Sequence, residues 1–494
     1  MRTPDHHSRR FAASLTAAAF LSTTSAVFAQ SAPWQLIWSD EFDGQFLNLN
    51  IWEPQIGTGT LYGLPSGWGN NERQYYTDRS QNLSVGGGWL TITARREDFN
   101  GSEYTSARIR TRGRFEFLYG RVEARITIPS GQGIWPAFWM LPTNSPYGGW
   151  AASGEIDIME STNNADQIYG TIHHGGPYPG NRSNGGTYAP GIDFGAAPHL
   201  YAVEWDPDQI RWYVDGVQYY SVNSSTWSST NAPDNERAPF DVPFHFLLNV
   251  AVGGNFPGPP NGSVGFPMQM QVDYVRVFRR QQLPYEPSPA LIPGQIEAER
   301  FDLGGPAVAY NDVDLPNNGG QFRLGESVDI ELSSEGSFNV GWIRQGEWLE
   351  YTTNVAVAGH YSVESRVAAA TAGGTFHLEF NGVDRTGPIV TGVTGGWQTW
   401  ATRTVQAAIP VGEQVMRFVN DSGSSSQFNL NWFRFTLLAE AGDVNADQSL
   451  DLEDLYTLEQ GNGAFRDVDL DGVAGTANDA RALRTILRVP EPEF

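Results

Sequence analysis

The sequence predicts an all-β protein: a jelly-roll β-sandwich, a second β-sandwich, and a small α-helical tail with Asp-rich loops. Glycine and proline are frequent, with 55 and 30 copies in 494 residues, and short runs of alternating apolar and polar residues lie between them. Such runs, bounded by turn residues, are typical of β-strands. The chain is longer than one ordinary domain, so we expect about two to four domains.

The first expected domain covers residues 30–282. Its alternating runs extend from Trp34 to about Arg280 and are separated by turns. The clearest runs are residues 89–94, 120–128, 201–205, 210–214 and 272–278. Many short strands in succession predict a two-sheet sandwich or jelly roll.

Residues 1–29, ahead of this domain, are expected to be a signal peptide. Arg9 and Arg10 precede an apolar stretch, and small residues precede Gln30 as in a signal cleavage site. The arginine pair fits either the general or the twin-arginine export route. We therefore expect a secreted, soluble mature chain.

Two further segments complete the chain. Residues 283–291 are rich in proline and are expected to form a linker. Residues 292–437 contain a second series of alternating runs, long enough to bury a core of their own. In residues 438–494 two Asp-rich runs, each followed by a helix-like segment, replace the alternation.

The composition excludes several classes of chemistry. The chain contains no cysteine and no lysine, since all 31 basic residues other than histidine are arginines. Thiol nucleophiles, disulfides, cysteine-bound zinc and lysine Schiff bases are therefore ruled out. A net charge of -24 argues against nucleic acid or an anionic membrane as partner.

Residues 154–160 (GEIDIME) carry three carboxylates in a run that otherwise resembles a strand. Side chains alternate faces along a strand, so Glu155 and Asp157 share a face and Glu160 would point the opposite way. A β-bulge at Ile158-Met159 would restore Glu160 to the same face, and bulges are enriched beside active sites. The alternative is an exposed acidic strand edge. With the bulge, two glutamates flank an aspartate, which suits cleavage of a glycosidic bond.

Tryptophans lie close to these acids in the sequence. Trp135 and Trp139 are in the run WPAFWMLP, and Trp150 follows shortly before Glu155. Indole rings stack against the apolar faces of sugars, although a place in the core is an equally good reading for any one of them.

The first domain resembles glycoside hydrolase family 16, in particular its laminarinase-like endo-β-1,3-glucanases. The resemblance rests on residues 38–42, 68–76, 135–140, 154–160 and 199–206 and extends over residues 34–280. It implies a retaining mechanism with Glu155 as nucleophile, Glu160 as acid/base and Asp157 assisting the nucleophile. Like-charge repulsion in so crowded a group is expected to raise the pKa of at least one carboxyl, which favours a protonated Glu160 and an ionised Glu155.

The same resemblance implies roles for other residues. Sugar hydroxyls would be bound by Asn71, Glu72 and Arg108 on the glycone side, and Trp135, Trp139 and Trp150 would line the cleft. His173 matches a histidine on the strand after the acids, with a purely structural role as the alternative. Glu41 and Asp273 would hold a structural calcium ion, with an ordinary surface pairing as the alternative.

The second domain resembles carbohydrate-binding module family 6, on residues 296–299, 338–343, 346–351, 395–400 and 428–433. This resemblance implies that Trp342 and Trp397 enclose a sugar ring and that Asn429 binds its hydroxyls. Glu297 and Glu299 would be calcium ligands. The family more often has tyrosine where Trp342 stands, which leaves the sugar open.

The tail resembles a dockerin. A twelve-residue loop places oxygen ligands at positions 1, 3, 5 and 12, and a second loop begins two dozen residues later. The expected ligands are Asp443, Asn445, Asp447 and Asp454 in the first loop and Asp467, Asp469 and Asp471 in the second. Gln448 replaces the usual turn glycine, and the second loop has Asn478 at position 12 with Asp479 one residue late. We expect calcium binding, and a cohesin is a possible partner.

Together these features predict a secreted, monomeric endo-β-1,3-glucanase that needs no cofactor for catalysis and binds structural Ca²⁺. One alternative keeps the fold and mechanism but acts on mixed-linkage β-glucan or a marine galactan. Another is a non-catalytic carbohydrate-binding or cell-surface protein. Transglycosylation is a further outcome of the same covalent chemistry.

Overall fold

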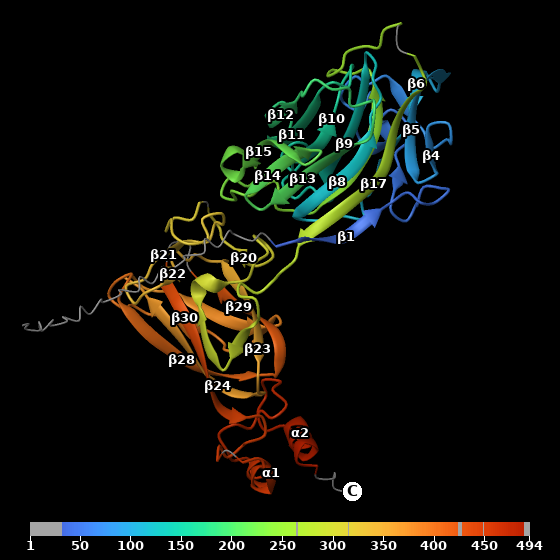
Figure 1. The fold of residues 1–494 in the computed structure, drawn as a ribbon. Helices are drawn as coiled ribbons and strands as arrows, with labels where there is room; N and C mark the ends of the chain where they lie inside the picture. Colours follow the sequence, from blue (N-terminus) through green and yellow to red (C-terminus); the bar gives the residue numbers. More distant parts are fainter. Residues whose placement is uncertain (1–31, 263–264, 315, 423–426, 448, 489–494) are drawn as a thin grey trace, which may run out of the picture. The chain divides into compact units, whose positions relative to one another are not determined.

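The computed structural model describes residues 32–262, 265–314, 316–422, 427–447 and 449–488. Two β-sandwiches are followed by two short helices, which confirms the predicted fold class (Figure 1). Residues 1–29, where the export signal is predicted, lie outside the described residues. None of the described helices has the length and apolar character needed to cross a bilayer.

The larger sheet of the first sandwich has ten strands. Its main path runs β15-β14-β13-β8-β17-β5-β6-β3, with β1 added beside β17 and β4 beside β5. The strands are β1 (Trp34–Asp40), β3 (Gln74–Tyr76), β4 (Leu83–Gly86), β5 (Trp89–Phe99), β6 (Ser102–Ser106), β8 (Gly120–Thr127), β13 (His199–Asp206), β14 (Gln209–Val214), β15 (Val217–Asn223) and β17 (Met268–Arg280). All five runs named from the sequence are among them.

The second sheet of this sandwich carries the acidic run. Its order is β12-β11-β10-β9-β16-β7-β2. The strands are β2 (Glu53–Pro54), β7 (Arg108–Arg110), β9 (Ile134–Pro142), β10 (Glu155–Glu160), β11 (Ile168–Gly175), β12 (Asn181–Tyr188) and β16 (Phe244–Val252). Because β10 lies between β9 and β11, the acidic run is an interior strand, and the alternative of an exposed edge is wrong.

Apolar side chains from both sheets fill the space between them. Ile156, Ile158 and Met159 of β10 pack there against Trp205 and Trp212 of the larger sheet, and each of the five is at most 1% exposed. Removal of this apolar surface from water is the main force that holds the two sheets together. The core therefore fixes one face of β10 and leaves the other for the carboxylates.

The second sandwich has a seven-stranded and a six-stranded sheet. The first contains β18 (Ala290–Ile292), β20 (Tyr310–Asn311), β23 (Trp348–Val355), β25 (Thr375–Phe380), β26 (Val383–Asp384), β27 (Ile389–Val390) and β29 (Gly412–Asn420). The second contains β19 (Gly294–Glu297), β21 (Ile330–Leu332), β22 (Phe338–Val340), β24 (Gly359–Ala368), β28 (Trp400–Ile409) and β30 (Asn429–Glu440). The first and last strands of this sandwich in the sequence, β18 and β30, extend slightly beyond the expected bounds of 292–437, as is common at element ends.

The tail contains α1 (Leu452–Glu459) and α2 (Ala477–Leu487). Each begins with a capping box, from Asp451 in α1 and from Thr476 in α2. Such caps satisfy amide groups that the first helical turn leaves without partners. The helices contribute to a small apolar cluster of five buried residues.

Candidate active site

Strand β10 contains the predicted bulge. On the β9 side Asp157 lies opposite Trp139, but the next partner, Phe138, lies opposite Met159. On the β11 side the register also shifts between Asp157 and Glu160. One extra residue is therefore absorbed between these two acids, which confirms the bulge expected at Ile158-Met159.

The bulge sorts the side chains of β10 by face. Ile158 and Met159 are consecutive, yet both are buried in the core. The acids instead meet polar partners: Trp150 donates from Nε1 to Glu155 Oε2 at 2.9 Å, and Trp135 donates from Nε1 to Glu160 Oε1 at 2.8 Å. Two of the three predicted tryptophans thus hold a carboxylate directly.

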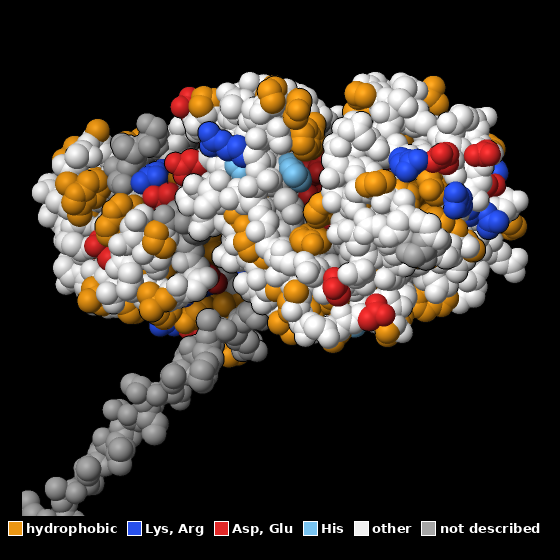
Figure 2. Space-filling model, turned by 90° about the horizontal axis from the view of Figure 1, so that it is seen from above, with side chains coloured by type: hydrophobic (Ala, Val, Ile, Leu, Met, Phe, Trp, Pro, Cys, Tyr) orange, Lys and Arg blue, Asp and Glu red, His pale blue; other side chains and the backbone are white. Residues whose placement is uncertain are grey.

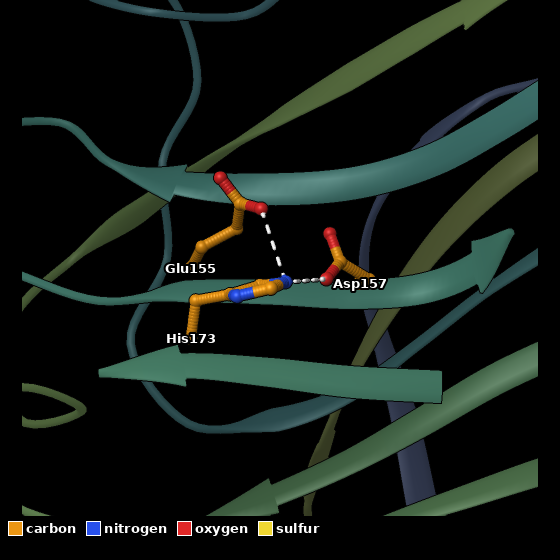
Figure 3. A group of neighbouring side chains, drawn as sticks. All are labelled: Glu155, Asp157 and His173. Atoms are coloured by element: carbon orange, nitrogen blue, oxygen red, sulfur yellow. Dashed lines mark ion pairs between the residues drawn. The ribbon is translucent and has the colours of Figure 1, made fainter. Parts of the chain in front are cut away.

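His173 joins the acidic group from the neighbouring strand. It lies opposite Glu155 in the β10–β11 register, and its Nε2 is 3.3 Å from Asp157 Oδ2 and 3.8 Å from Glu155 Oε1 (Figure 3). Figure 2 shows a hollow in which histidine and carboxylate atoms lie beside hydrophobic side chains. The contacts place His173 among the acids, which favours a site role over the purely structural alternative.

The pKa values of the site are strongly perturbed. Burial, followed by the charge of Asp157, raises the pKa of both Glu155 and Glu160. Burial alone would lower the pKa of His173, but Asp157, whose Oδ2 lies 3.3 Å from His173 Nε2, and the other neighbouring carboxyl groups outweigh it and raise the pKa to about 9. His173 is therefore a cation at neutral pH.

The shift at Glu160 matches the expectation from spacing, and the shift at Glu155 adds to it. The pKa of Glu160 is raised, as the crowding of the acids predicted, although burial is the larger cause. Burial raises the pKa of Glu155 as well, to about 8, which the spacing of the acids did not predict. Repulsion can be anticipated from spacing, whereas desolvation depends on what covers the side chain.

Arg108 and Glu72, both expected to bind sugar, lie in one buried polar network. The Arg108 guanidinium lies 4.4 Å from the ring centre of Trp68 and 4.8 Å from that of Trp139. Burial raises the pKa of Glu72, although the charge of Arg108 acts to lower it. Glu72 accepts hydrogen bonds from Gln74 at 2.7 Å, Asn70 at 3.3 Å and Tyr76 at 3.4 Å.

The structure adds Asn249, on β16, to this network. Asn249 accepts a hydrogen bond from Trp139 Nε1 at 2.8 Å and donates to the Tyr76 hydroxyl at 3.2 Å. Sequence reasoning missed it, although a lone amide in the apolar run FHFLLNVAV is a usable signal. Asn71, in contrast, is exposed and donates to Asn255 at 2.8 Å.

Comparison with known proteins agrees with this geometry. Residues 70–247 match the sequence profile of glycosyl hydrolases family 16. The beta-glucanase of Rhodothermus marinus is 44% identical over 256 residues, which are 50% of this chain and 85% of that protein. The chain belongs to glycosyl hydrolases family 16. It is therefore a glycoside hydrolase.

Other relatives of this family 16 hydrolase also match about half of the chain. The glucan endo-1,3-beta-glucosidase A1 of Niallia circulans is 46% identical over 264 residues, 51% of this chain but only 38% of that protein. The chain thus matches less than half the length of that relative. The catalytic domain of an endo-1,3-beta-glucanase (laminarinase) from Thermotoga petrophila RKU-1 is 42% identical, with 51% of this chain and 99% of that chain covered and a TM-score of 0.46.

The second sandwich of the family 16 hydrolase matches the profile of carbohydrate binding module family 6 over residues 320–437. Asn429 donates from Nδ2 to the Trp397 carbonyl at 2.8 Å and to Glu331 Oε1 at 2.7 Å. Its side chain also lies against Gly341, the neighbour of Trp342. The structure therefore places Asn429 beside Trp397 and beside the backbone next to Trp342, and it adds Glu331, which sequence reasoning missed.

Trp342 and Trp397 have features typical of a binding site. Trp342 has a φ of 50°, which is uncommon for a bulky residue and costs backbone energy. Trp397 leaves 39% of its surface exposed, although large aromatic side chains are usually buried. An exposed aromatic ring beside a fixed amide is suited to stacking on a sugar.

The residues predicted to bind calcium in the first sandwich, Glu41 and Asp273, differ in their surroundings from Glu299 in the second. Glu41 forms an ion pair with Arg276 at 2.7 Å, and Asp273 forms one with Arg125 at 2.6 Å. This is the surface pairing that the sequence left as the alternative to calcium. Glu299, in contrast, is 1% exposed, and its Oε2 has no hydrogen-bond partner among the described residues. An orphaned buried carboxylate oxygen fits a cation.

The two loops of the tail use their last acid in the same way. Asp454 accepts from the amides of Val444 and Asn445, and Asp479 accepts from those of Val468 and Asp469. Oxygen atoms of Asp467, Asp469 and Asp479 lie within 4.8 Å of one another. Asp479 rather than Asn478 therefore completes the second loop, while Asp471 accepts from the Val473 amide.

Proposed function

We propose that the family 16 domain is a retaining endo-β-1,3-glucanase in which Glu155 is the nucleophile and Glu160 the acid/base. The observation that carries this proposal is the bulge in β10. It releases Glu160 from the core-facing position that strict alternation would give it and leaves three carboxylates and His173 on one surface. Paired carboxyl groups on one surface are what glycoside hydrolysis requires.

The reaction proceeds in two displacements. In the first, the Glu155 carboxylate attacks the anomeric carbon, the glycosidic C–O bond breaks, and Glu160 gives its proton to the departing oxygen. In the second, Glu160 takes a proton from water, the water oxygen attacks the same carbon, and the ester to Glu155 breaks. The two inversions together retain the anomeric configuration.

The surrounding side chains support these roles. The His173 cation lowers the pKa of Glu155, and so does the N–H of Trp150, which favours the ionised nucleophile. Burial and the charge of Asp157 raise the pKa of Glu160, which favours the protonated acid. Attack requires ionised Glu155 beside neutral Glu160. The charge of Glu155 raises the pKa of Glu160, so the two groups titrate as a coupled set.

The substrate assignment rests on relatives. A protein named glucan endo-1,3-beta-glucosidase is 46% identical over the catalytic half, and a laminarinase catalytic domain is 42% identical. We therefore place β-1,3-glucan ahead of mixed-linkage glucan and galactan. A non-catalytic binding role is disfavoured, because three crowded, buried carboxyl groups destabilise a fold and contribute nothing to simple binding.

A matched pair of variants tests this function. Glu155→Gln is expected to abolish release of reducing sugar from laminarin, whereas Glu103→Gln, which changes an exposed glutamate of the larger sheet, is expected to preserve it. Lichenan, agarose and carrageenan complete the substrate panel. Wild-type turnover by Glu155→Gln would refute the catalytic assignment, and cleavage of agarose but not laminarin would refute the substrate.

We further propose that the second sandwich binds the same polymer through Trp342, Trp397 and Asn429. A tethered binding module keeps the catalytic domain close to an insoluble chain and raises its effective concentration there. A depletion isotherm of the full chain on insoluble β-1,3-glucan measures this, and equal depletion on cellulose would contradict it.

Calcium binding is proposed at Glu297 and Glu299 and in the two tail loops. The support is Oε2 of Glu299 and Oδ1 of Asp467, both buried and both without a hydrogen-bond partner in the part of the chain that the structure describes. Equilibrium dialysis of the full chain with Ca²⁺ counts the bound ions, and Glu299→Gln and Asp467→Asn should each remove one. Export, a monomeric state and docking to a cohesin remain predictions; sedimentation with and without a cohesin domain checks the last two.

A further inference from the structure

The bulged backbone of β10 is held from the opposite sheet. Trp212, on β14, is fully buried, and its Nε1 donates a hydrogen bond of 2.8 Å to the carbonyl oxygen of Asp157. A bulge disrupts the ladder and leaves a residue of its strand unpaired. The indole N–H therefore supplies a donor at the point where the regular pairing of β10 is interrupted, between two of the site's acids.

The neighbouring strand leaves room for this contact. A Cβ placed on Gly170 of β11 would lie 2.4 Å from Trp212 Cδ1 and 2.5 Å from the Tyr219 hydroxyl. No real side chain tolerates such distances, so Gly170 is required for the indole to reach under the strand pair. Gly170 is also next to Tyr169, which lies opposite Glu160. The packing beneath the bulge is thus specific to the residues present.

We propose that Trp212 is a positioning residue that fixes the bulge of β10 and so sets the placement of Glu160 relative to Glu155. It touches neither substrate nor a reacting atom and acts through the Asp157 carbonyl. The inference rests on the proposed roles of the two glutamates. It adds a residue of the opposite sheet to the parts on which the reaction depends.

Loss of the N–H has a defined consequence. The Asp157 carbonyl is buried, and a buried carbonyl without a hydrogen-bond donor raises the free energy of the folded state. Without the indole N–H, the carbonyl is therefore expected to shift toward another donor. The strand cannot adopt a regular register at low cost, because that register would bury the Glu160 carboxyl in the apolar core. The strand would therefore relax locally, and displacement of a reacting group by about 1 Å can reduce turnover about 10²-fold. Sugar-contacting side chains are untouched, so kcat falls more than KM rises.

Two replacements of Trp212 and one control test the proposal. Trp212→Phe removes the N–H and part of the ring. Replacement of Trp212 by 3-benzothienylalanine removes only the N–H, because sulfur stands in its place within a ring of nearly the same shape. Tyr219→Phe is the control, since its hydroxyl is buried in the same gap and has no hydrogen-bond partner among the described residues.

For both Trp212 replacements we expect kcat on laminarin to fall about 10- to 100-fold, KM to change less than about threefold, and the pH profile of kcat/KM to shift. Tyr219→Phe should keep the wild-type kcat and profile. If the benzothienylalanine protein keeps both, the proposal is overturned, even where Trp212→Phe fails to fold. Glu155→Gln assayed in parallel separates the two ideas, because its full activity would overturn the proposed function instead.

Discussion

The indole N–H of Trp135 donates a hydrogen bond of 2.8 Å to Oε1 of Glu160. This bond stabilises the ionised carboxylate and lowers the pKa of Glu160, whereas burial and the charge of Asp157 raise it more strongly. The acid is thus held by a donor that opposes its protonation. In the proposed reaction Glu160 first gives and then takes a proton, and this hydrogen bond holds its carboxyl in place for both steps.

Trp135→Phe should move the alkaline limb of the pH profile to higher pH. The substitution keeps an aromatic ring but removes the N–H, so the pKa of Glu160 rises further and the acid stays protonated in more alkaline solution. The profile of kcat/KM on laminari-oligosaccharides measures the limb. A limb that stays in place, or moves to lower pH, would contradict the assigned hydrogen bond.

Glu160→Gln should distinguish substrates by their leaving groups. General acid catalysis contributes about 10²- to 10⁴-fold, so turnover of laminarin should fall by that order. An aryl β-glucoside whose phenol is acidic releases that phenol as phenolate, without protonation. Formation of the glycosyl-enzyme from this substrate should therefore be far less affected. A pre-steady-state burst of phenol measures that step. Equal losses on both substrates would argue against an acid/base role for Glu160.

His173→Asn should move the acidic limb to higher pH. His173 is a cation at neutral pH, and its charge lowers the pKa of Glu155, the proposed nucleophile. Without the charge, Glu155 becomes ionised only in more alkaline solution, so activity near pH 6 should fall more than activity near pH 8. His199→Asn, at a histidine of β13 paired with Asp215, is the control that should leave the limb unchanged.

Glu155→Gln should stabilise the fold in neutral and alkaline solution. Burial raises the pKa of Glu155 from 4.5 to about 8, so the unfolded chain ionises first and stability is lost as pH rises through this range. The amide carries no such penalty. Each kcal/mol gained raises Tm by about 2–4 °C in a domain of this size. Calorimetry should show a gain at pH 8 that disappears at pH 4; a constant gain would point to packing instead.

Trp397→Ala should weaken binding to insoluble β-1,3-glucan. The ring is 39% exposed, and its own carbonyl accepts from Asn429, so the substitution removes a stacking surface next to a fixed amide. We expect the Kd for the polymer to rise at least about tenfold. Trp348→Ala, in the opposite sheet of the same sandwich, is the control. If both variants lose the same affinity, the ring of Trp397 has no specific role.

Much of strand β10 could be predicted because its pattern is local. Alternation along residues 154–160 conflicts with a shared face for Glu155 and Glu160, and only an inserted residue resolves the conflict. The nearby tryptophans followed from spacing and family resemblance, and Trp135 and Trp150 hold the two glutamates as hydrogen-bond donors. These inferences needed no knowledge of how the sheets pack.

Contacts between distant segments could not be predicted in this way. Trp212 is 55 residues from Asp157, and Asn249 is 110 residues from Trp139. No periodicity links such positions, since their meeting depends on strand order and on which sheet covers which. Asp479 is a local case: the sequence placed it one residue late in the second tail loop, and the geometry of the cap of α2 shows that it takes the place of Asn478.

The sequence by itself determined the two sandwiches, the bulge and the identity of the acids, because alternation and its interruption are properties of consecutive residues. Tertiary structure alone decided the raised pKa of Glu155 and the hydrogen bond from Trp212 to the bulged strand. Both depend on what surrounds β10 in space: desolvation of a carboxyl and satisfaction of a buried carbonyl are set by segments that the chain brings together only on folding.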